Sequence, residues 1–531
     1  MKHITLSILL LLLSLFVIAQ DIKYRINSTT EQSDKSKTAG FDYKLIYESK
    51  DFYYFDLYSR NDIYVQQIGG ITNNHSLLKV SKDLKTLKKK EIELNKREKT
   101  KGIFELNDNL VAISLRPNNK ENTNTLNIRV LDKNSLNVIK ATDIFTQNDS
   151  KYSRSLRYEL RQSEDKSKLA ILYTLYTSRQ VPYRLGIIVI GRDLEVLWST
   201  NNFSPTYDGI YSQENFLVAN NGDIYALGRV MRDDKNNPAA NQFSKGNIFS
   251  GYITYDVDKA GYQYQLNVIS NNGLSQGFIN LSILDHDIRS VNVDIADDKK
   301  KIFCYGIFSN KGQISAKGTF ISEIDMDAKT LYVIDKSKFS NELITKGFSE
   351  KELKSYNKRE KRRIITDPFD YDLSRIKYKT DGSKYFIAEQ KLYGNIETTE
   401  SKASFFNYND IYIIEINKKN KITNIDKVSK RQAYNENKFI SYSELYKNNK
   451  HYLIFNTTEN KFLVNCLLVS VDNKGQQKSA ELYKYKNKRV EAFVPSRSVY
   501  SELDFFIYTR LTIKFAQRYY IETLTIDEYD R

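Results

Sequence analysis

Apolar and polar residues alternate along most of this chain in short runs, and Asp, Asn or Gly residues interrupt the runs. Clear examples are residues 126–144 (LNIRVLDKNSLNVIKATDI), 186–200 (GIIVIGRDLEVLWST) and 466–483 (CLLVSVDNKGQQKSAELY). Alternation with many β-branched and aromatic side chains predicts β-strands, whereas Asp, Asn and Gly predict turns. Each run therefore indicates a β-hairpin.

This hairpin recurs along the chain, and an apolar strand precedes each of its turns. The turn residues are Asp83, Asp132, Asp193, Asp256, Asp325, Asn417, Asp472 and Asp527. The preceding strands are expected at residues 62–69, 104–116, 168–177, 223–231, 301–308, 384–393, 451–458 and 504–513, as the inner strands of the repeats. Repeats of roughly 60 residues predict a radial array of four-stranded sheets. We therefore predict an all-β, eight-bladed β-propeller, with seven blades as the alternative if one repeat is degenerate.

The two ends of the chain predict how such a ring closes. The last repeat stops just after its turn, so it lacks an outer strand, and residues 41–49 (FDYKLIYES) form a strand before the first complete repeat. We expect residues 41–49 to pair with residues 519–527, since closure removes the exposed sheet edges. Residues 41–531 are then a single propeller domain, and residues 20–40 are a flexible lead-in.

One interval between turns is 92 residues long and indicates an insertion at about residues 338–368. Within it, residues 349–363 (SEKELKSYNKREKRR) have the composition of a solvated helix, with a Ser349–Glu352 capping box at the start and Asp367–Pro368 at the end. The helix lacks the apolar face of a membrane-binding amphipathic helix. It is either a solvated helix without a partner or a docking element for anions or proteins. Its candidate binding residues are Lys351, Lys354, Lys358, Arg359, Lys361, Arg362 and Arg363.

The N-terminus predicts the compartment. Lys2 and His3 precede a short apolar run that ends at Val17-Ile18-Ala19, which is typical of a signal peptide over residues 1–19. The run is shorter than the ~20 residues that span a bilayer. No Cys lies at the expected cleavage site, because the first one is Cys304. We expect an exported protein, periplasmic or secreted or at the cell surface, that is neither a lipoprotein nor membrane-spanning.

The chain has 81 Lys and Arg against 65 Asp and Glu, a formal net charge of +16. Export excludes intracellular nucleic acid as a partner. The candidate partners are an envelope protein or an anionic polysaccharide or lipid surface. Lys-rich codon usage without any partner is the alternative explanation of the charge. The oligomeric state stays open.

Residues that carry chemistry are sparse. We interpret Cys304 and Cys466, each within an apolar run, as buried free thiols rather than a disulfide. The sequence GLSQG (273–277) matches a nucleophile elbow, but extended structure follows it, so we interpret it as a loop between blades. Residues 256–261 resemble the start of a calcium loop, yet Ala260 occupies a ligand position. His75, His286 and His451 lack metal-ligand spacing. We therefore predict no catalytic residue, no metal and no cofactor.

A resemblance covers about a third of the chain. Residues 301–325 (KIFCYGIFSNKGQISAKGTFISEID), the basic insertion, residues 367–390 (DPFDYDLSRIKYKTDGSKYFIAEQ) and residues 407–417, followed by Lys430-Arg431-Gln432, carry it. On these stretches residues 280–460 resemble a family of uncharacterised exported β-propeller-like proteins of Bacteroidota-type bacteria. The resemblance implies a propeller fold and an envelope location, and no catalytic residues. Asp381-Gly382-Ser383 departs from the Asp-Gly-Gly of the family, which affects only turn geometry.

These observations favour an exported, non-enzymatic propeller that serves as a binding or scaffold module in the cell envelope or outside the cell. A propeller holds its loops on a rigid framework, which suits binding. The alternative is a propeller-fold hydrolase or lyase acting on glycans or peptides. Such an enzyme needs acid and base carboxylates, or a nucleophile, that converge on the central channel.

Overall fold

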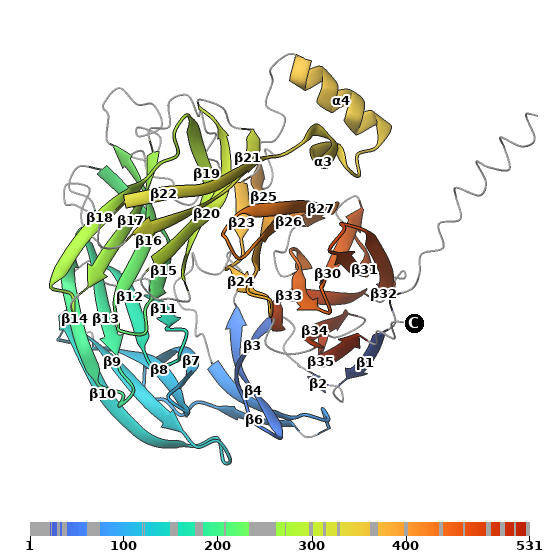
Figure 1. The fold of residues 1–531 in the computed structure, drawn as a ribbon. Coiled ribbons are helices and arrows are strands. Elements are labelled where there is room, and N and C mark those ends of the chain that lie inside the picture. The colour runs from blue at the N-terminus through green and yellow to red at the C-terminus, as the bar shows by residue number, and fades with distance from the viewer. Residues whose placement is uncertain are drawn as a thin grey trace, which may run out of the picture. The chain divides into compact units, whose positions relative to one another are not determined.

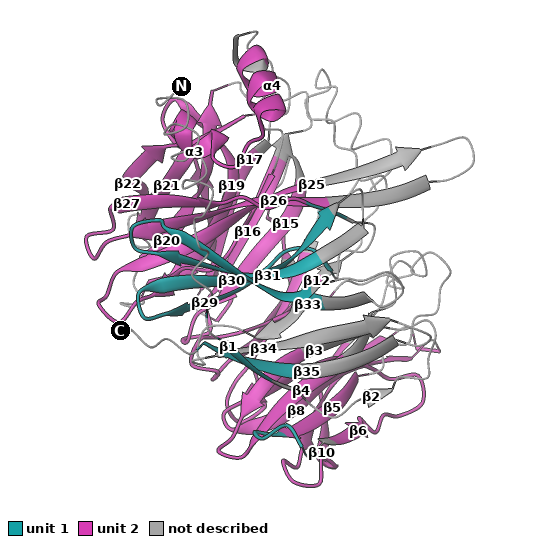
Figure 2. Ribbon diagram, turned by 90° about the vertical axis from the view of Figure 1, so that its right-hand side faces the viewer, with its two compact units in different colours: residues 1–38, 81–86, 432–531 teal, residues 39–80, 87–431 magenta. Residues whose placement is uncertain are grey.

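The computed structural model describes residues 22, 24–28, 32–33, 40–60, 75–85, 87–118, 120–121, 123–148, 158–175, 184–205, 209–232, 262–270, 272–296, 301–311, 315–325, 330–361, 370–397, 402–434, 439–459, 462–484, 490–499, 505–513 and 517–526. The chain divides into two compact units (Figure 2). The larger unit comprises residues 39–80 and 87–431, and the smaller one comprises residues 1–38, 81–86 and 432–531.

The described residues of the larger unit form six antiparallel sheets, in which strands adjacent in sequence pair (Figure 1). The first three sheets are β3 (Gly40–Glu48), β4 (Phe52–Arg60), β5 (His75–Ser81) and β6 (Leu87–Glu91); β7 (Lys99–Leu106), β8 (Asn109–Asn118), β9 (Thr123–Leu131) and β10 (Val138–Asn148); and β11 (Tyr158–Gln162), β12 (Leu169–Leu175), β13 (Arg184–Ile190) and β14 (Val196–Phe203).

The other three are β15 (Gly209–Val218), β16 (Ile224–Arg232), β17 (Tyr262–Ser270) and β18 (Ser275–Leu281); β19 (His286–Ile295), β20 (Lys301–Asn310), β21 (Ala316–Asp325) and β22 (Thr330–Lys338); and β23 (Asp370–Leu373), β24 (Lys377–Tyr378), β25 (Lys384–Glu397), β26 (Lys402–Ile416) and β27 (Ile422–Val428). Two helices, α3 (Asn341–Thr345) and α4 (Glu350–Lys361), lie between β22 and β23. The predicted helical insertion is thereby confirmed.

The smaller unit contributes two further sheets among the described residues. One consists of β29 (Ser443–Lys447), β30 (Lys450–Glu459), β31 (Phe462–Asp472) and β32 (Gln477–Lys484). The other consists of β33 (Val490–Val499), β34 (Phe505–Ile513) and β35 (Gln517–Ile526), with β1 (Tyr24–Ser28) and β2 (Gln32–Ser33) paired to β35. The unit also contains β28 (Gln432–Tyr434).

The predicted fold class is confirmed: the protein is an all-β β-propeller, for which seven blades are found, the alternative number named above. Hydrogen bonding alone divides the described strands into eight sheets, one more than that number.

The predicted Asp and Asn turns connect the third and fourth strands of their sheets. Asp132 Oδ1, between β9 and β10, accepts hydrogen bonds from the N–H groups of Asn134 and Ser135 at 3.1 and 2.5 Å. Asn417 and Asp472 accept two such bonds each at the corresponding places of later sheets. These bonds satisfy the turn backbone, which explains why Asp and Asn recur there. Asp527 lies outside the described residues.

The turn predicted at Asp256 is wrong for the β15–β18 sheet. Asp256 lies outside the described residues, in the connection from β16 to β17, and the third strand is β17 (Tyr262–Ser270). The chain turns instead at Asn272 and Gly273, which have φ angles of 55° and 82°. Asn and Gly tolerate this left-handed backbone best. The Asn272-Gly273 pair is therefore itself typical of the turn found here.

The predicted inner strands are the second strands of their sheets. Residues 168–177, 223–231 and 301–308 correspond to β12, β16 and β20, and a further strand pairs with each of them on the other side. Residues 104–116 fall across the β7–β8 hairpin instead. Residues 62–69 lie outside the described residues. The first strands were missed because they are less apolar: β11 (YELRQ) alternates between half-buried and exposed positions.

The predicted pairing of residues 41–49 with residues 519–527 is also wrong. Residues 40–48 form β3, the first strand of the β3–β6 sheet, and β3 pairs with β4. The strand that adds to β35 is β1, with Tyr24 opposite Ile526 and Ile26 opposite Leu524. Residues 24–28 had been assigned to the lead-in because their apolar side chains are few. Ile22, at 9% exposure, nevertheless packs with Leu524 and Ile526.

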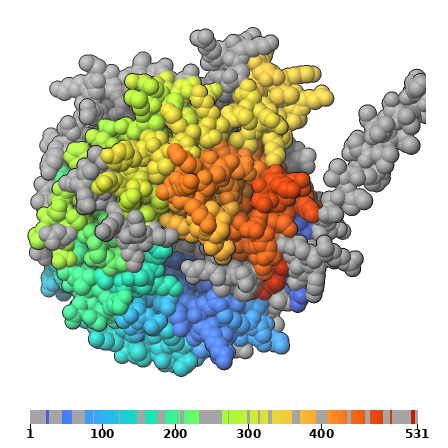
Figure 3. Space-filling model, in the orientation of Figure 1, coloured from blue at the N-terminus to red at the C-terminus, as the bar shows by residue number. Residues whose placement is uncertain are grey.

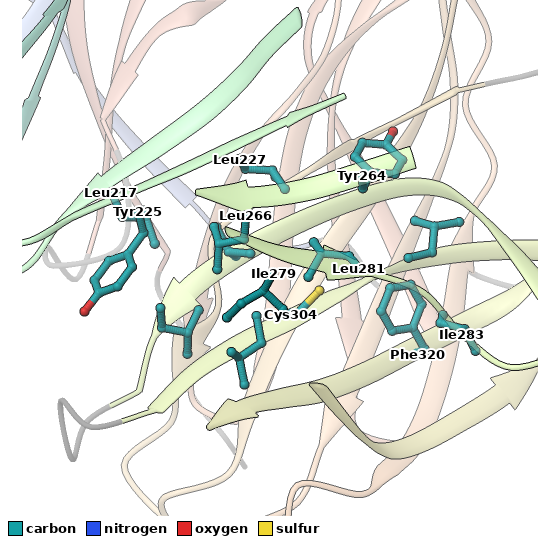
Figure 4. Packing of buried hydrophobic residues seen from close by; sticks show 14 of the residues in the cluster. Leu217, Tyr225, Leu227, Tyr264, Leu266, Ile279, Leu281, Ile283, Cys304 and Phe320 are labelled. Carbon is teal, nitrogen blue, oxygen red and sulfur yellow. The ribbon is translucent and has the colours of Figure 1, made fainter. Parts of the chain in front are cut away.

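Within the larger unit, successive sheets pack face against face. Leu227, Leu266 and Ile279 of the β15–β18 sheet pack with Cys304 and Phe320 of the β19–β22 sheet (Figure 4). The first strands of these sheets also lie side by side, β11 beside β15, β15 beside β19 and β19 beside β23. The core is therefore distributed between sheets rather than gathered at one centre.

Polar side chains connect the first strands of neighbouring sheets. Along β19, Ser290 accepts a hydrogen bond from Tyr371 N–H at 3.0 Å, and Asn292 donates one to Leu373 O at 3.2 Å. Asp294, the next residue on the same side, accepts one from Ile376 N–H at 3.0 Å. This spacing of two follows from strand geometry. It satisfies backbone groups that face a neighbouring sheet, which apolar packing alone leaves without partners.

Candidate functional site

The insertion between β22 and β23 carries the candidate binding residues, and its helix begins as the sequence predicts. Ser349 precedes α4, and its Oγ accepts a hydrogen bond from Glu352 N–H at 3.3 Å. In return, Ser349 N–H donates to Glu352 Oε2 at 2.8 Å, and this bond holds the pKa of Glu352 below its ordinary value. The Ser349–Glu352 capping box is thus confirmed.

One side of α4 is anchored to the sheet below it. Tyr356 is 9% exposed, and its ring meets the ring of Phe348 edge-on with centroids 5.9 Å apart. Glu352, besides capping the helix, pairs with Arg431 Nη2 at 3.3 Å. The guanidinium of Arg431 also lies 5.8 Å from the centre of the Phe348 ring. An aromatic contact and an ion pair therefore fix the same side of the helix.

The short helix α3 is held from the end of β27. Lys427 Nζ donates a hydrogen bond to Ile344 O at 2.6 Å, and Ser429 Oγ donates one to Lys346 O at 2.9 Å. Carbonyl groups at a helix C-terminus have no partner within the helix, and a cation is favourable there. Lys427 therefore stabilises the end of α3 and connects the insertion to the sheet.

A buried cluster of charged side chains lies beneath the insertion. Asp410 Oδ2 pairs with Lys427 Nζ at 2.7 Å, and Asp410 Oδ1 pairs with Arg431 Nη1 at 2.9 Å. Lys430 pairs with Glu389, and both side chains are excluded from solvent. Burial lowers the pKa of Lys430, while Glu389 and Asp410 act in the opposite direction. With Glu352, which also pairs with Arg431, three cations face three carboxylates, so the cluster is neutral and holds the insertion in place.

The opposite side of α4 is basic and faces solvent. Lys351, Lys354 and Lys358 are exposed, at spacings of three and four residues that place them on one face of a helix. This face lies about 170° around the axis from Tyr356, by the 100° per residue of an α-helix. In the part of the chain that the structure describes, none of the three ammonium groups forms an ion pair. We call Lys351, Lys354 and Lys358 the lysine face.

The structure describes only part of the predicted basic set. Arg359 and Lys361 belong to α4, but the structure describes only their backbone. Arg362 and Arg363 lie outside the described residues. In the space-filling view α3 and α4 form the yellow projection at the upper right (Figure 3). The lysine face is thus presented on a projecting element.

A cleft of about 650 Å³ lies beside α3, between that helix and strands β22 and β27. Its lining includes Lys338 and Lys346 together with Glu342, and it also includes neutral polar groups such as Asn424. Sequence reasoning missed this cleft, because its two sides are about 80 residues apart in the chain.

The GLSQG motif does not form a nucleophile elbow. Ser275 is the first residue of β18 and pairs with Ser270 across the β17–β18 hairpin. An elbow needs a strand that turns into a helix, whereas here a strand turns into a strand. The motif therefore lies in a hairpin within one sheet. The predicted position between two blades is wrong.

The described histidines and the cysteines contact the protein core or its polar side chains. His75 Nδ1 lies 2.8 Å from Asp56 Oδ1, and the His286 ring stacks on Phe308 with centroids 4.5 Å apart. His451 is buried. No three His, Cys, Asp or Glu residues among those described are grouped as a metal site requires. Cys304 and Cys466 are buried free thiols, as predicted, and burial raises the pKa of each.

No described helix is long and apolar enough to cross a membrane. No family model matches the chain, and no curated protein matches it. Among solved structures, the chain is similar to the β-propeller domain of the Trilobed protease from Pyrococcus furiosus, with 12% identity and a TM-score of 0.35, over 85% of this chain and 98% of that one.

Two further solved structures are similar to most of this chain, also at low identity and low TM-score. The WD40 domain of SCAP from fission yeast gives 9% identity and a TM-score of 0.38 over 95% of this chain and 94% of that one. Prolyl oligopeptidase B from Galerina marginata gives 9% identity and a TM-score of 0.38 over 90% of this chain, which spans only 55% of the peptidase. At such identities no activity and no site residue is transferred. The sheets described above define the class of protein as a β-propeller. Its function has to be argued from its own residues.

Proposed function

We propose that this protein is an exported, non-enzymatic propeller that acts as a binding module, and that the lysine face of α4 docks an anionic polysaccharide. The observation that carries the proposal is the orientation of α4. One side of the helix is fixed by Tyr356 and Glu352, and the other side holds Lys351, Lys354 and Lys358 in solvent. Cations held in a row, with no carboxylate partner among the described residues, suit a chain of regularly spaced anions.

The lysine face favours a polymer over a lipid surface. A helix that binds a membrane buries an apolar face at the interface. The anchored side of α4 is occupied by the Phe348–Tyr356 contact, and Leu353 is the large apolar side chain of the helix that is notably exposed, at 40%. One half-exposed leucine supplies little apolar area. The cleft beside α3 holds two further lysines, Lys338 and Lys346, together with Glu342.

Three buried carboxylates with cations beside them favour a binding role over acid–base catalysis. Glu98 pairs with Arg129, Asp294 with Arg375, and Asp410 with Lys427. A general acid needs a carboxyl group whose pKa is raised, by burial without a cation beside it. The pKa of Glu98 is instead held below its ordinary value: burial opposes this, but hydrogen bonds from Arg129, Ser114 and the Asn95 N–H prevail.

The test is binding of the full chain to dextran sulfate, a sulfated polysaccharide, with a triple variant K351Q/K354Q/K358Q. We expect the variant to bind at least tenfold more weakly and with a smaller dependence on salt, because fewer counterions are displaced. The matched control K120Q/K419Q/K474Q removes the same charge from three exposed turn positions. Equal loss in both triple variants would show that only net charge matters. Binding of the wild type to anionic phospholipid vesicles but not to dextran sulfate would assign the face to lipid and overturn the proposal.

A further inference from the structure

A second cavity, of about 200 Å³, lies at the first strands of consecutive sheets in the larger unit. Its lining comes from β11, from β15 and the turn after it, from Ile295 at the end of β19, and from Arg375 just after β23. These first strands lie side by side, so four sheets contribute to one small enclosure. The size suits a single-ring ligand, since cavities for drug-sized ligands start at about 300 Å³.

Arg375 is held rigidly at this cavity. Its Nη2 and Nε atoms bond to the two oxygens of Asp294 at 2.5 and 3.3 Å. Asp294 in turn accepts a hydrogen bond from Ile376 N–H and is nearly excluded from solvent. This two-point pairing uses two of the five N–H donors and leaves both of those on Nη1 and one on Nη2. The Arg375 side chain is itself 56% exposed, so the paired guanidinium stays within reach of a ligand.

Arg161 supplies a second cation to the cavity from β11. Its guanidinium lies 5.6 Å from the centre of the Phe216 ring, and its Nη1 donates to Leu160 O at 3.2 Å. Among the described residues, no carboxylate lies within ion-pair distance of Arg161. The remaining donors of this side chain are therefore available to an anion. A planar guanidinium supported by an aromatic ring is a preferred partner for a carboxylate.

The rest of the lining narrows the class of ligand. Asn215 and Asn221 already donate one amide N–H each, to Asn292 Oδ1 and Asp223 Oδ2, and their second N–H matches a hydroxyl group. Tyr225 adds a phenol whose hydroxyl points away from the neighbouring apolar cluster (Figure 4). Glu164 lines the cavity as well and would repel a second negative charge. Asp294 already neutralises Arg375, so Arg161 is the cation left for a ligand. One such cation, together with the remaining donors of Arg375 and several amides, suits a monoanion with hydroxyl groups. A polyanion is disfavoured.

We infer that this cavity binds a compact monocarboxylate that carries hydroxyl groups, of the size of one uronic acid residue, with its carboxylate between Arg161 and Arg375. The inference is independent of the lysine face. It places a small-molecule site on the first strands of the sheets, where the sequence had shown no motif. Arg161 and Arg375 are more than 200 residues apart in the chain, so only the packing of the sheets unites them.

The test uses the full chain and free galacturonate, with neutral galactose as the matched ligand, by isothermal titration calorimetry. We expect galacturonate to bind and galactose to bind at least tenfold more weakly. R161Q should weaken galacturonate binding about tenfold to hundredfold, which is typical for a lost hydrogen bond to a charged group. R192Q, which removes an exposed arginine outside the cavity, should leave binding unchanged.

Two outcomes would overturn the inference: equal affinity for galacturonate and galactose, or an R161Q variant that binds like the wild type. Retention of fold is checked for R161Q by its thermal transition, since Arg161 is exposed and makes no ion pair among the described residues. The K351Q/K354Q/K358Q variant should still bind galacturonate. The small-molecule site and the proposed polysaccharide surface therefore succeed or fail separately.

Discussion

Substitution of Asp410 by Asn is expected to destabilise the protein strongly. Asp410 neutralises two cations, Lys427 at 2.7 Å and Arg431 at 2.9 Å, and accepts a hydrogen bond from Lys430 N–H at 3.2 Å. The Lys427 side chain is only 1% exposed, so the variant leaves a buried ammonium without its Asp410 carboxylate, in contact with the Ile344 carbonyl and, at 4.8 Å, the Phe348 ring. Breaking a buried pair on one side costs about 3–5 kcal/mol. This corresponds to roughly two to four powers of ten in the folding equilibrium.

The matched control is D143N, in which the carboxylate lies 2.6 Å from Arg116 but both side chains are at least one-third exposed. An exposed pair contributes about 0–1 kcal/mol. The assay is urea denaturation followed by the fluorescence of Trp198, the only tryptophan, which is buried in the larger unit. The double variant D410N/K427M should recover part of the loss, since it removes the buried ammonium that D410N leaves without a carboxylate. A D410N variant no less stable than D143N would refute the reasoning.

Four further predictions test other parts of the structure. S349A removes the N-cap of α4 and should cost about 1 kcal/mol locally, seen as faster tryptic cleavage within the helix, whereas S349D should not. G186A should destabilise the protein by at least about 1–3 kcal/mol in urea denaturation, because its Cβ would lie 1.9 Å from the Tyr173 ring; G382A, in an open turn, adds strain from its φ of 80° but no clash with the core. The pKa of Glu98 is lower in the folded protein than the unfolded value near 4.5. Its contribution to the free energy of unfolding is therefore complete above pH 4.5 and is lost as the pH falls through the folded-state pKa. E98Q should make the free energy of unfolding depend less on pH below about 4.5. Cys304 should not react with a thiol reagent until the protein unfolds, because the side chain is fully buried and its pKa is raised. Reaction of Cys304 in the folded protein as fast as that of an exposed thiol would contradict the structure.

The sequence predicted the fold class because its signals are local. Alternation of apolar residues and the Asp and Asn turns act over a few residues, and turns such as Asp132 and Asn417 lie where their hairpins require them. The Ser349–Glu352 capping box is equally local and was also predicted correctly. Errors arose where a local signal was weak or duplicated. Tyr24 and Ile26 form too short a pattern to stand out, and Asp256 resembled a turn that Asn272 and Gly273 actually make.

The repeat of β-hairpins, the helical insertion and its many lysines can all be predicted from the residues alone. Which side of α4 is free depends on packing, since Tyr356 contacts Phe348 and Glu352 pairs with Arg431. Packing alone also brought Arg161 and Arg375 to one cavity. The physical reason is that periodicity reports which face of an element is apolar, whereas contacts between distant elements depend on how those faces pack.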